Sequence, residues 1–304
     1  MSVTANLIKQ LRNLTGSPII NCKQALEESA GDLTKAQEWL RVKGISQAHK
    51  KLGKSVSAGL VGGLITPNAG YLLEVLCETD FVARTDMFQK FTTDTLMSWS
   101  KSQLPFSQIS SLHLEGFNQT LEEAKLESIS KLGENVLVRR GEMMEQCGKS
   151  AVGLYLHNSV NSLLSQSGCM LKLQAEKPLA EEDKEWISKL ANSLCMQVVA
   201  AKPLFLFKNQ IPIEFREKER MAVEEQIDEK TKAKPKNIYD EIVKGKLEKS
   251  LDQVTLFEQT FMISEEPGEK SVKQVLHEAS KKIDSPLAIT GYKFYQCESE
   301  IQQS

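Results

Sequence analysis

The sequence has no uncharged apolar run long enough to cross a membrane. Such a run needs about 18 residues, and the apolar stretches of this 304-residue chain are shorter. The first residues, MSVTANLIKQLRN, also lack the apolar centre of a secretory signal. With 38 basic and 40 acidic residues, the chain has no broad electrostatic attraction to nucleic acid or to an anionic membrane. We therefore expect a soluble protein that binds neither of them directly.

Patterns of catalytic and metal-binding residues are also missing. The six cysteines are scattered without a C-x-x-C pair, which is typical of reduced thiols in an intracellular compartment. The four histidines show no H-E-x-x-H spacing, and there is no G-x-S-x-G sequence for a serine nucleophile. GKS occurs twice, but Ala48 and Met143 replace the earlier glycine that a phosphate-binding loop requires. These absences predict no covalent catalysis, no metal and no cofactor.

Residues 3–52 have the pattern of three short helices. The first ends at Gly16, the second has Ser17 as its cap, and the third closes at Gly44. The residues expected to be buried are Leu7, Ile8, Leu11 and Leu14, then Ile19, Ile20, Cys22, Ala25 and Leu26, then Leu33, Ala36, Trp39 and Leu40. The pattern predicts a three-helix bundle.

Strands followed by a helix occur twice in the rest of the chain. After a linker at 53–60, the turn sequence PNAG separates two apolar runs, which predicts a β-hairpin, and a helix is expected over 84–99. Strands and a long helix return between 151 and 200, and the chain closes with a strand at 286–298. This order favours an α+β fold with antiparallel sheets. The expected domains are the bundle at 1–52, core halves at 53–140 and 141–212, a helical hairpin at 213–252, and completion of the second half at 253–304.

Residues 214–250 differ in kind, because charged residues of both signs dominate them. Apolar positions at helical spacing flank Pro235, which predicts two charged helices folded back along a narrow seam. The seam residues are Met221, Val223 and Ile227, then Ile242, Val243, Leu247 and Leu251. A solvated or disordered insertion is the alternative. Beyond it, 254–264 has the pattern of a strand and 270–282 that of a helix.

The segment LCETDFVART, residues 76–85, joins a strand-like run to a helix. Its polar residues suit a helix cap, and the large apolar Phe81 follows them. The ring can pack on the core as a hydrophobic staple. Alternatively it stays outside and enters a groove on a partner, since binding anchors are often aromatic. The residues alone leave both interpretations open.

Several segments resemble the elongation factor Ts family. LRNLTGSPIINCKQALEESAGDLTKAQEWLR is similar to its N-terminal signature, L-R-x-x-T-G followed by [DN]-C-K-x-A-L and G-D, and CETDFVAR contains the T-D-F-V of the second signature. KLGENVLVRR, VGLYLH, VVAAKPLFL and TGYKFYQCE are similar to later segments of the family. The resemblance covers almost the whole chain.

This resemblance implies a guanine-nucleotide exchange factor that acts by binding, without covalent chemistry. The partner would be elongation factor Tu, in its GDP-bound and nucleotide-free forms, and disturbance of its Mg²⁺ and phosphate site would release GDP during translation elongation. The family fold implies a bundle like a ubiquitin-associated (UBA) domain, a two-part core, and a protruding helical hairpin that could mediate self-association. The residues implied in partner binding are Thr79, Asp80, Phe81, Val82, Arg12, Ile19, Ile20, Lys23 and His157. For the two isoleucines, an ordinary place in the helix core is the alternative.

Some positions depart from the family pattern. Asn158 stands where many members have glycine after the histidine, Ile19-Ile20 where bacterial members often have methionines, and residues 293–299 replace the usual R-F-E-V-G-E-G. A UBA-like scaffold without exchange activity is the alternative function, but a scaffold has no need of T-D-F-V after a strand. A small kinase or hydrolase comes third, because its motifs are missing.

The expected compartment is the mitochondrial matrix. CETDFVAR and the departures elsewhere resemble mitochondrial members. The chain starts directly at the bundle without an Arg-rich transit segment, which favours a bacterial cytoplasm or a processed organelle protein. A bacterial or plastid soluble compartment is the alternative.

Overall fold

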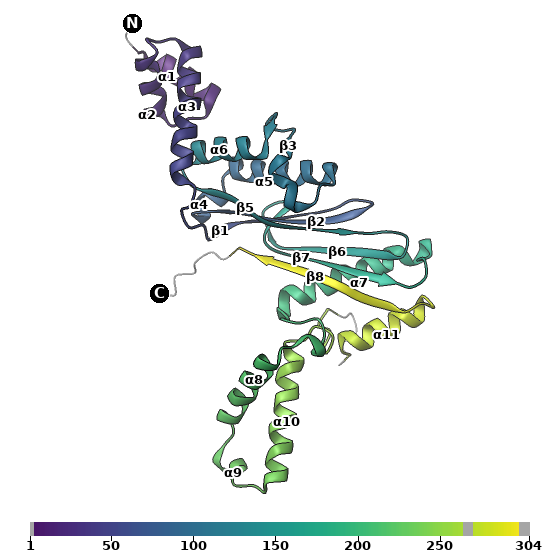
Figure 1. The fold of residues 1–304 in the computed structure, drawn as a ribbon. Coiled ribbons are helices and arrows are strands. Elements are labelled where there is room, and N and C mark those ends of the chain that lie inside the picture. The colour runs from purple at the N-terminus through teal and green to yellow at the C-terminus, as the bar shows by residue number, and fades with distance from the viewer. Residues whose placement is uncertain (1–2, 264–269, 298–304) are drawn as a thin grey trace. The chain divides into compact units, whose positions relative to one another are not determined.

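The chain begins with helices and continues as a mixture of strands and helices, so the predicted α+β class is confirmed. The computed structural model describes residues 3–263 and 270–297 (Figure 1). Its helices are α1 (Ala5–Thr15), α2 (Ile19–Glu28), α3 (Leu33–Lys51), α4 (Asp80–Ala83), α5 (Asp86–Ser102), α6 (Leu121–Leu132), α7 (Glu181–Ala201), α8 (Ile213–Glu225), α9 (Glu229–Lys232), α10 (Lys236–Gln253) and α11 (Val272–Lys282). Its strands are β1 (Ala58–Ile65), β2 (Ala69–Cys77), β3 (His113–Leu114), β4 (Gln119–Thr120), β5 (Val136–Glu145), β6 (Ser150–Ser159), β7 (Leu164–Ala175) and β8 (Leu287–Gln296).

Helices α1, α2 and α3 pack around a small apolar core, so the predicted bundle is confirmed. Thr4 caps α1 by accepting a hydrogen bond from the Leu7 N–H, and Asp32 caps α3 in the same way. The buried residues of the bundle are Leu11, Cys22, Ala25, Leu26, Ala36 and Leu40.

Three residues expected in this core lie outside it. The exposed fractions of the side chains are 64% for Leu14, 53% for Ile19 and 80% for Ile20. These positions flank the connection between α1 and α2, where the neighbouring turns of helix that would cover them are absent. The expectation that they are buried is therefore wrong.

The third helix does not close at Gly44 but continues to Lys51. Gly44 is buried against α6, and a Cβ atom there would lie 2.2 Å from the Ser130 Oγ. The glycine thus allows α3 and α6 to approach closely. A glycine at a tight helix contact and a glycine at a helix end look alike in the sequence.

The predicted hairpin is formed by β1 and β2, which pair antiparallel from Ala58↔Cys77 to Ile65↔Gly70. Hydrogen bonds between Thr66 and Ala69 close the turn. The strands are hydrogen-bonded in the order β5-β2-β1-β7-β6, with β8 also pairing with β7, while β3 and β4 form a small separate sheet. Helix α5 packs on β1 and β2, and α6 packs on α5 (Figure 1).

The chain divides into two compact units. Unit 1 comprises residues 1–144, 156–168 and 295–304, and unit 2 comprises 145–155 and 169–294. In unit 1, β2 packs on α5, with the Tyr71 and Trp99 rings edge to face at 5.1 Å. In unit 2, α7 packs on β7, β8 and α11. The domain boundaries drawn from the sequence stay a prediction.

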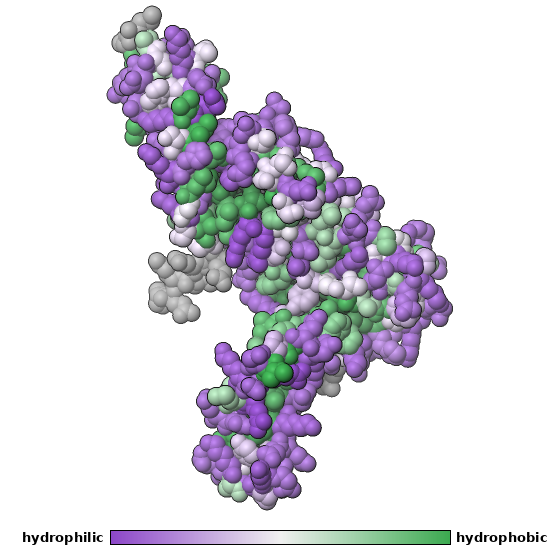
Figure 2. Space-filling view, viewed as in Figure 1, coloured by the Kyte–Doolittle hydropathy of each residue, from purple (hydrophilic) through white to green (hydrophobic). Residues whose placement is uncertain are grey.

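Within unit 2, α8 and α10 pack side by side and are joined through α9, as the charged segment predicts. Of the predicted seam residues, Ile227 just after α8 and Val243 and Leu251 of α10 are buried, but Met221 is 62% exposed and lies outside the seam. Figure 2 shows hydrophilic residues over most of the visible face of this hairpin. Pro235 caps α10, so it marks the turn between the helices.

The strand expected at 254–264 does not form in the described residues 254–263. That segment contributes only isolated bridges, Phe205↔Thr255 and Thr260↔Ser271. The buried amide of Gln197 accepts a hydrogen bond from the Met262 N–H at 2.9 Å and donates to the Thr260 carbonyl at 3.2 Å. A side chain from α7 therefore satisfies backbone groups that a strand would have paired in a ladder.

Candidate partner-binding site

Phe81 lies in the first turn of α4, and its side chain is 79% exposed. The next two residues, Val82 and Ala83, are buried. One short turn of helix thus buries two small apolar residues and leaves the large one outside the core. This exposure excludes the staple interpretation, while the role of the ring in binding stays a prediction.

Thr79 is the residue that caps α4. Its Oγ1 accepts a hydrogen bond from the Val82 N–H at 3.4 Å. The Thr79 N–H and hydroxyl both donate to the carboxylate of Glu134, at 2.9 and 2.7 Å. Glu134 follows α6 and was not among the residues expected at the site. The only sequence signal for it was its place in KLGENVLVRR, one of the segments similar to the family.

Asp80 occupies the first position of α4, where a negative charge suits the helix N-terminus. Its Oδ2 accepts a hydrogen bond from the Arg84 Nη2 at 3.0 Å. The Arg84 side chain is largely exposed and that of Asp80 is partly exposed, so this ion pair contributes little to stability. The carboxylate remains accessible to a partner.

The helix expected over 84–99 is α5, which begins at Asp86 and ends at Ser102. Thr85 caps α5 by accepting a hydrogen bond from the Phe88 N–H at 3.3 Å, and its hydroxyl donates to the Val82 carbonyl at 2.7 Å. Helix α4 is therefore a separate turn with a threonine at each end. Such a turn presents Phe81 from a defined backbone rather than from a loop.

Cys77 is the last residue of β2 and binds the backbone just before α4. Its thiol is buried and donates to the Thr79 carbonyl at 3.1 Å. Burial raises the pKa of Cys77 to about 12, and the nearby negative charge of Glu134 adds to the effect. The thiol therefore stays protonated and remains a hydrogen-bond donor at neutral pH.

A cavity of about 240 Å³ lies beside α4 within unit 1. Its walls are Asp80 and Ala83 of α4, Arg84 just after this helix, residues 58–60 of β1, and Val160, Gln166 and Cys297. The Cys297 N–H donates to the Gln166 carbonyl at 3.0 Å, which holds the end of the described chain at this place. Val160 is 43% exposed, so a second apolar side chain lies near Asp80.

His157 is exposed in the part of β6 that belongs to unit 1. Asn158 follows it with a φ of 53°, a left-handed conformation that glycine and asparagine adopt more readily than other residues. The asparagine thus preserves the backbone that a glycine would take there. Its Nδ2 donates to the Gln166 Oε1 at 3.2 Å, which ties the end of β6 to the wall of the cavity.

The other predicted binding residues lie on the bundle. Ile19 and Ile20 form the exposed start of α2, and Lys23 lies one turn further along. Arg12 is exposed in the last turn of α1. The bundle thus exposes an apolar pair at the start of α2, a lysine on the same helix and an arginine on α1.

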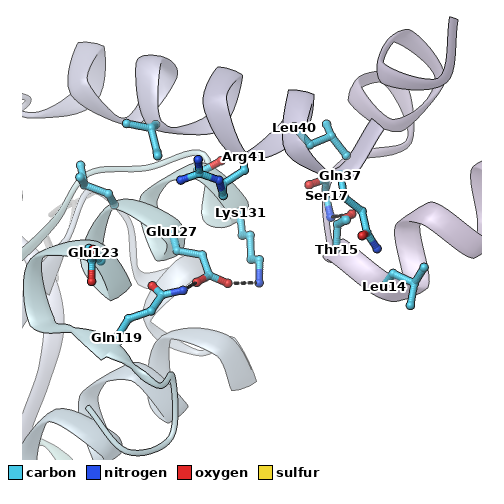
Figure 3. A pocket seen from close by; sticks show the side chains of 13 residues that line it. Leu14, Thr15, Ser17, Gln37, Leu40, Arg41, Gln119, Glu123, Glu127 and Lys131 are labelled. Atoms are coloured by element: carbon cyan, nitrogen blue, oxygen red, sulfur yellow. Dashed lines mark hydrogen bonds and ion pairs between the residues drawn. The ribbon is translucent and has the colours of Figure 1, made fainter. Parts of the chain in front are cut away.

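A second cavity, of about 420 Å³, lies between the bundle and α6 (Figure 3). Its charged side chains are already paired. Glu127 accepts hydrogen bonds from Gln119 and Lys131, and Arg41 pairs with Glu38. The space is therefore a gap between packed helices rather than a polar ligand site.

Among the described residues, no cluster of three or more His, Cys, Asp or Glu side chains could hold a metal ion. Within residues 3–263 and 270–297, no helix is both long enough and apolar enough to cross a membrane.

The chain is similar in sequence to elongation factor Ts proteins along almost its whole length. The sequence model of a family described as "Elongation factor TS" matches residues 78–297, and one described as "Elongation factor Ts, mitochondrial, N-terminal" matches residues 1–50. The chain is 35% identical to an elongation factor Ts of Rhodospirillum rubrum over 303 residues, which cover 99% of this chain and 94% of the relative. It is 32% identical over 292 residues to the elongation factors Ts of Brucella anthropi and of Bartonella bacilliformis, in each case covering 96% of this chain and 92% of the relative.

Proposed function

This chain belongs to the elongation factor Ts family, and from that membership we propose that it is a guanine-nucleotide exchange factor for elongation factor Tu in translation elongation. It acts by binding and breaks no covalent bond, so it needs no acid, base or nucleophile. The observation that carries the proposal is the exposed Phe81 ring on a short helix that Thr79 caps and that Thr85 separates from α5.

The ring acts as a wedge. A GTPase holds its nucleotide through a phosphate-binding loop and through a Mg²⁺ ion that bridges phosphate oxygens to the protein. Insertion of Phe81 beside that site, with Asp80 next to it, displaces the groups that position the ion. The phosphates then lose much of their attraction to the partner, and GDP leaves.

A wedge must be rigid to do this. An exposed ring on a mobile loop would lose conformational entropy on binding, and that loss would weaken the complex. Helix α4 avoids the loss, because Thr79 caps its start and the Thr85 hydroxyl donates to the Val82 carbonyl at its end. The Cys77 thiol also holds the Thr79 carbonyl. Val82 and Ala83, buried on the inner side of the turn, fix it against the core.

The bundle supplies a second point of contact. Ile19 and Ile20 provide apolar contact area, while Arg12 and Lys23 provide positive charges that favour encounter with an acidic partner surface. His157, on the exposed end of β6, makes a third contact next to Asn158. The bundle, the end of β6 and α4 thus all contribute to the affinity for elongation factor Tu, while α4 alone displaces the groups that position the Mg²⁺ ion.

Thermodynamic linkage couples the binding of the factor to the binding of nucleotide by elongation factor Tu. A factor that weakens GDP binding is itself bound more weakly to the GDP-bound partner than to the nucleotide-free one, by the same free energy. Both forms are therefore partners, and GTP binding releases the factor at the end of the cycle.

The test is release of a fluorescent GDP from purified elongation factor Tu. The protein should accelerate release in proportion to its concentration until it saturates. Binding without acceleration would overturn the proposal and would support a scaffold instead.

The mitochondrial matrix is the compartment that we propose. The match to the mitochondrial N-terminal model supports it, although the relatives compared above are bacterial. Fractionation of cells that express the protein at its natural level would test this, and recovery outside mitochondria would contradict it.

A further inference from the structure

Glu134 makes the closest polar contact to the start of α4. It follows Gly133, whose φ of 75° ends α6 in a left-handed conformation. Each oxygen of the carboxylate accepts one hydrogen bond from Thr79, one from the backbone N–H at 2.9 Å and one from the hydroxyl at 2.7 Å. Hydrogen bonds to an ionised carboxylate are stronger than neutral ones, so this contact holds both the backbone and the side chain of Thr79.

The carboxylate also sets the direction of the Thr79 hydroxyl. A carboxylate only accepts hydrogen bonds, so the single hydroxyl proton is directed to Glu134. A lone pair of the same oxygen then faces the Val82 N–H, which it accepts at 3.4 Å. The cap of α4 is thus oriented by a residue outside the helix.

Two hydrogen bonds donated by Asn135 reinforce this connection. The Asn135 N–H donates to the Glu78 Oε1 at 2.7 Å, and the Asn135 Nδ2 donates to the Lys54 carbonyl at 2.9 Å. Glu78 and Thr79 are therefore joined side by side to Asn135 and Glu134. The turn after α6 holds the chain where it leaves β2 and enters α4.

Phe81 depends on this connection more than a buried residue would. With its ring 79% exposed, few core contacts fix its direction, so the backbone of α4 decides where it points. From these contacts we propose that Glu134 is a positioning residue, which holds α4 in the orientation that presents Phe81 to the partner. The inference rests on the proposed exchange function and assigns Glu134 a part in it.

The test uses near-isosteric changes that remove single contacts. Glu134→Gln replaces one acceptor with a donor, and Thr79→Val removes the hydroxyl, whereas Thr79→Ser keeps it. Glu122→Gln is the matched control, because Glu122 lies on α6 but pairs with Lys125. Stimulated GDP release is measured against the concentration of each variant, which gives a maximal rate and a half-saturating concentration.

Misplacement of a group by about 1 Å can cost up to about a hundredfold in rate. We expect Glu134→Gln and Thr79→Val to lower the maximal rate about tenfold. Thr79→Ser keeps the hydroxyl and should lower the maximal rate less than Thr79→Val does. Glu122→Gln should match the parent, because it removes only the ion pair that the half-exposed Glu122 makes with Lys125. A merely structural role would reduce the fraction of folded protein, which raises the half-saturating concentration but leaves the maximal rate unchanged. An unchanged maximal rate in Glu134→Gln therefore overturns the inference.

A double variant separates the inference from the function on which it rests. If Glu134 acts through Phe81, then Glu134→Gln should have little further effect in a Phe81→Ala background. If Glu134→Gln lowers the maximal rate by the same factor in both backgrounds, Glu134 does not act through Phe81. That result would overturn the positioning role and leave the proposed role of Phe81 unaffected. A Phe81→Ala protein with the parent rate would instead overturn the wedge itself, and the positioning role with it.

Discussion

Thr79 and Glu134 lie 55 residues apart in the chain and share two hydrogen bonds, of 2.9 and 2.7 Å. Thr79 follows β2 and caps α4, while Glu134 follows α6 and precedes β5. The segment that presents Phe81 is thus held from both sides, by its own strand and by a distant turn. Its conformation depends on tertiary structure rather than on the local sequence alone.

Replacing Phe81 should separate exchange from stability. Phe81→Ala should change the free energy of unfolding by less than about 1 kcal/mol, because the exposed ring loses few contacts. The stimulated rate of GDP release should fall about tenfold, which corresponds to ~1.4 kcal/mol of lost coupling. Phe88→Ala is the control, since that ring is fully buried and its loss should cost about 3–5 kcal/mol. Full exchange activity in a folded Phe81→Ala protein would contradict the wedge.

Asp80 should matter for exchange more than for folding. Asp80→Ala removes a largely exposed ion pair with Arg84 but leaves the Thr79 cap, so the free energy of unfolding should change by less than about 1 kcal/mol. Exchange should fall, because the carboxylate no longer reaches the partner. Arg84→Ala removes the same ion pair and keeps the carboxylate, so it should lower exchange less. Equal losses in the two variants would assign the effect to the ion pair.

The sequence was sufficient to predict the features that repeat along a helix or strand. The apolar periodicity of 3–52 and the PNAG turn predicted the bundle and the β1–β2 hairpin. The T-D-F-V resemblance pointed to Phe81, whose exposure the residues alone left open.

Features that depend on contacts between distant segments were missed. Gly44 had the pattern of a helix end, and only the approach of Ser130 shows why a glycine lies inside α3. The strand-like 254–263 forms no ladder, and Gln197 of α7 binds the backbone of Thr260 and Met262 there. Glu134 gave no local signal, because its partner Thr79 belongs to another element.

The contact between α3 and α6 makes a second stability prediction. Gly44→Ala should destabilise the protein by about 1–3 kcal/mol, because the new Cβ would lie 2.2 Å from the Ser130 Oγ. Ser130→Ala should restore part of the loss. Gly245→Ala in α10 is the control: nothing lies within 4 Å of its added Cβ, so it should stabilise by about 0.5–1 kcal/mol. Thermal unfolding measures all three, and a neutral Gly44→Ala would contradict the close contact.

The cysteines should differ sharply in reactivity. Cys147 is exposed, and the Lys149 backbone N–H and the Ser150 hydroxyl lower its pKa by stabilising the thiolate. Its thiolate fraction therefore rises at lower pH than in the unfolded chain, and iodoacetamide should modify it first. Burial raises the pKa of Cys77 and protects it. Mass spectrometry after labelling across pH 6–9 would show this order. Ser150→Ala should shift the Cys147 profile to higher pH, and earlier labelling of Cys77 would contradict the assignment.

Removal of the outer part of the helical hairpin tests whether it is a separate module. Helices α8 and α10 pack against each other, and Val243 of α10 and Ile227, which follows α8, are buried. At their base, the Arg216 Nη2 donates to the Lys208 carbonyl at 2.6 Å, and Lys208 pairs with Glu248 at 2.7 Å. Replacing residues 219–247 with a short Gly-Ser linker keeps these base contacts. The shortened protein should remain folded and accelerate GDP release at the parent rate, because the Phe81 site belongs to unit 1.

The same deletion tests whether the hairpin mediates self-association, as the family resemblance implies. Light scattering of the parent and shortened proteins at equal concentration gives their masses. A parent dimer that becomes a monomer on deletion would assign the contact to the hairpin, whereas equal oligomeric states would contradict that role. Failure of the shortened protein to fold would mean that the seam between α8 and α10 stabilises unit 2 as a whole, and the hairpin would then not be a separable module.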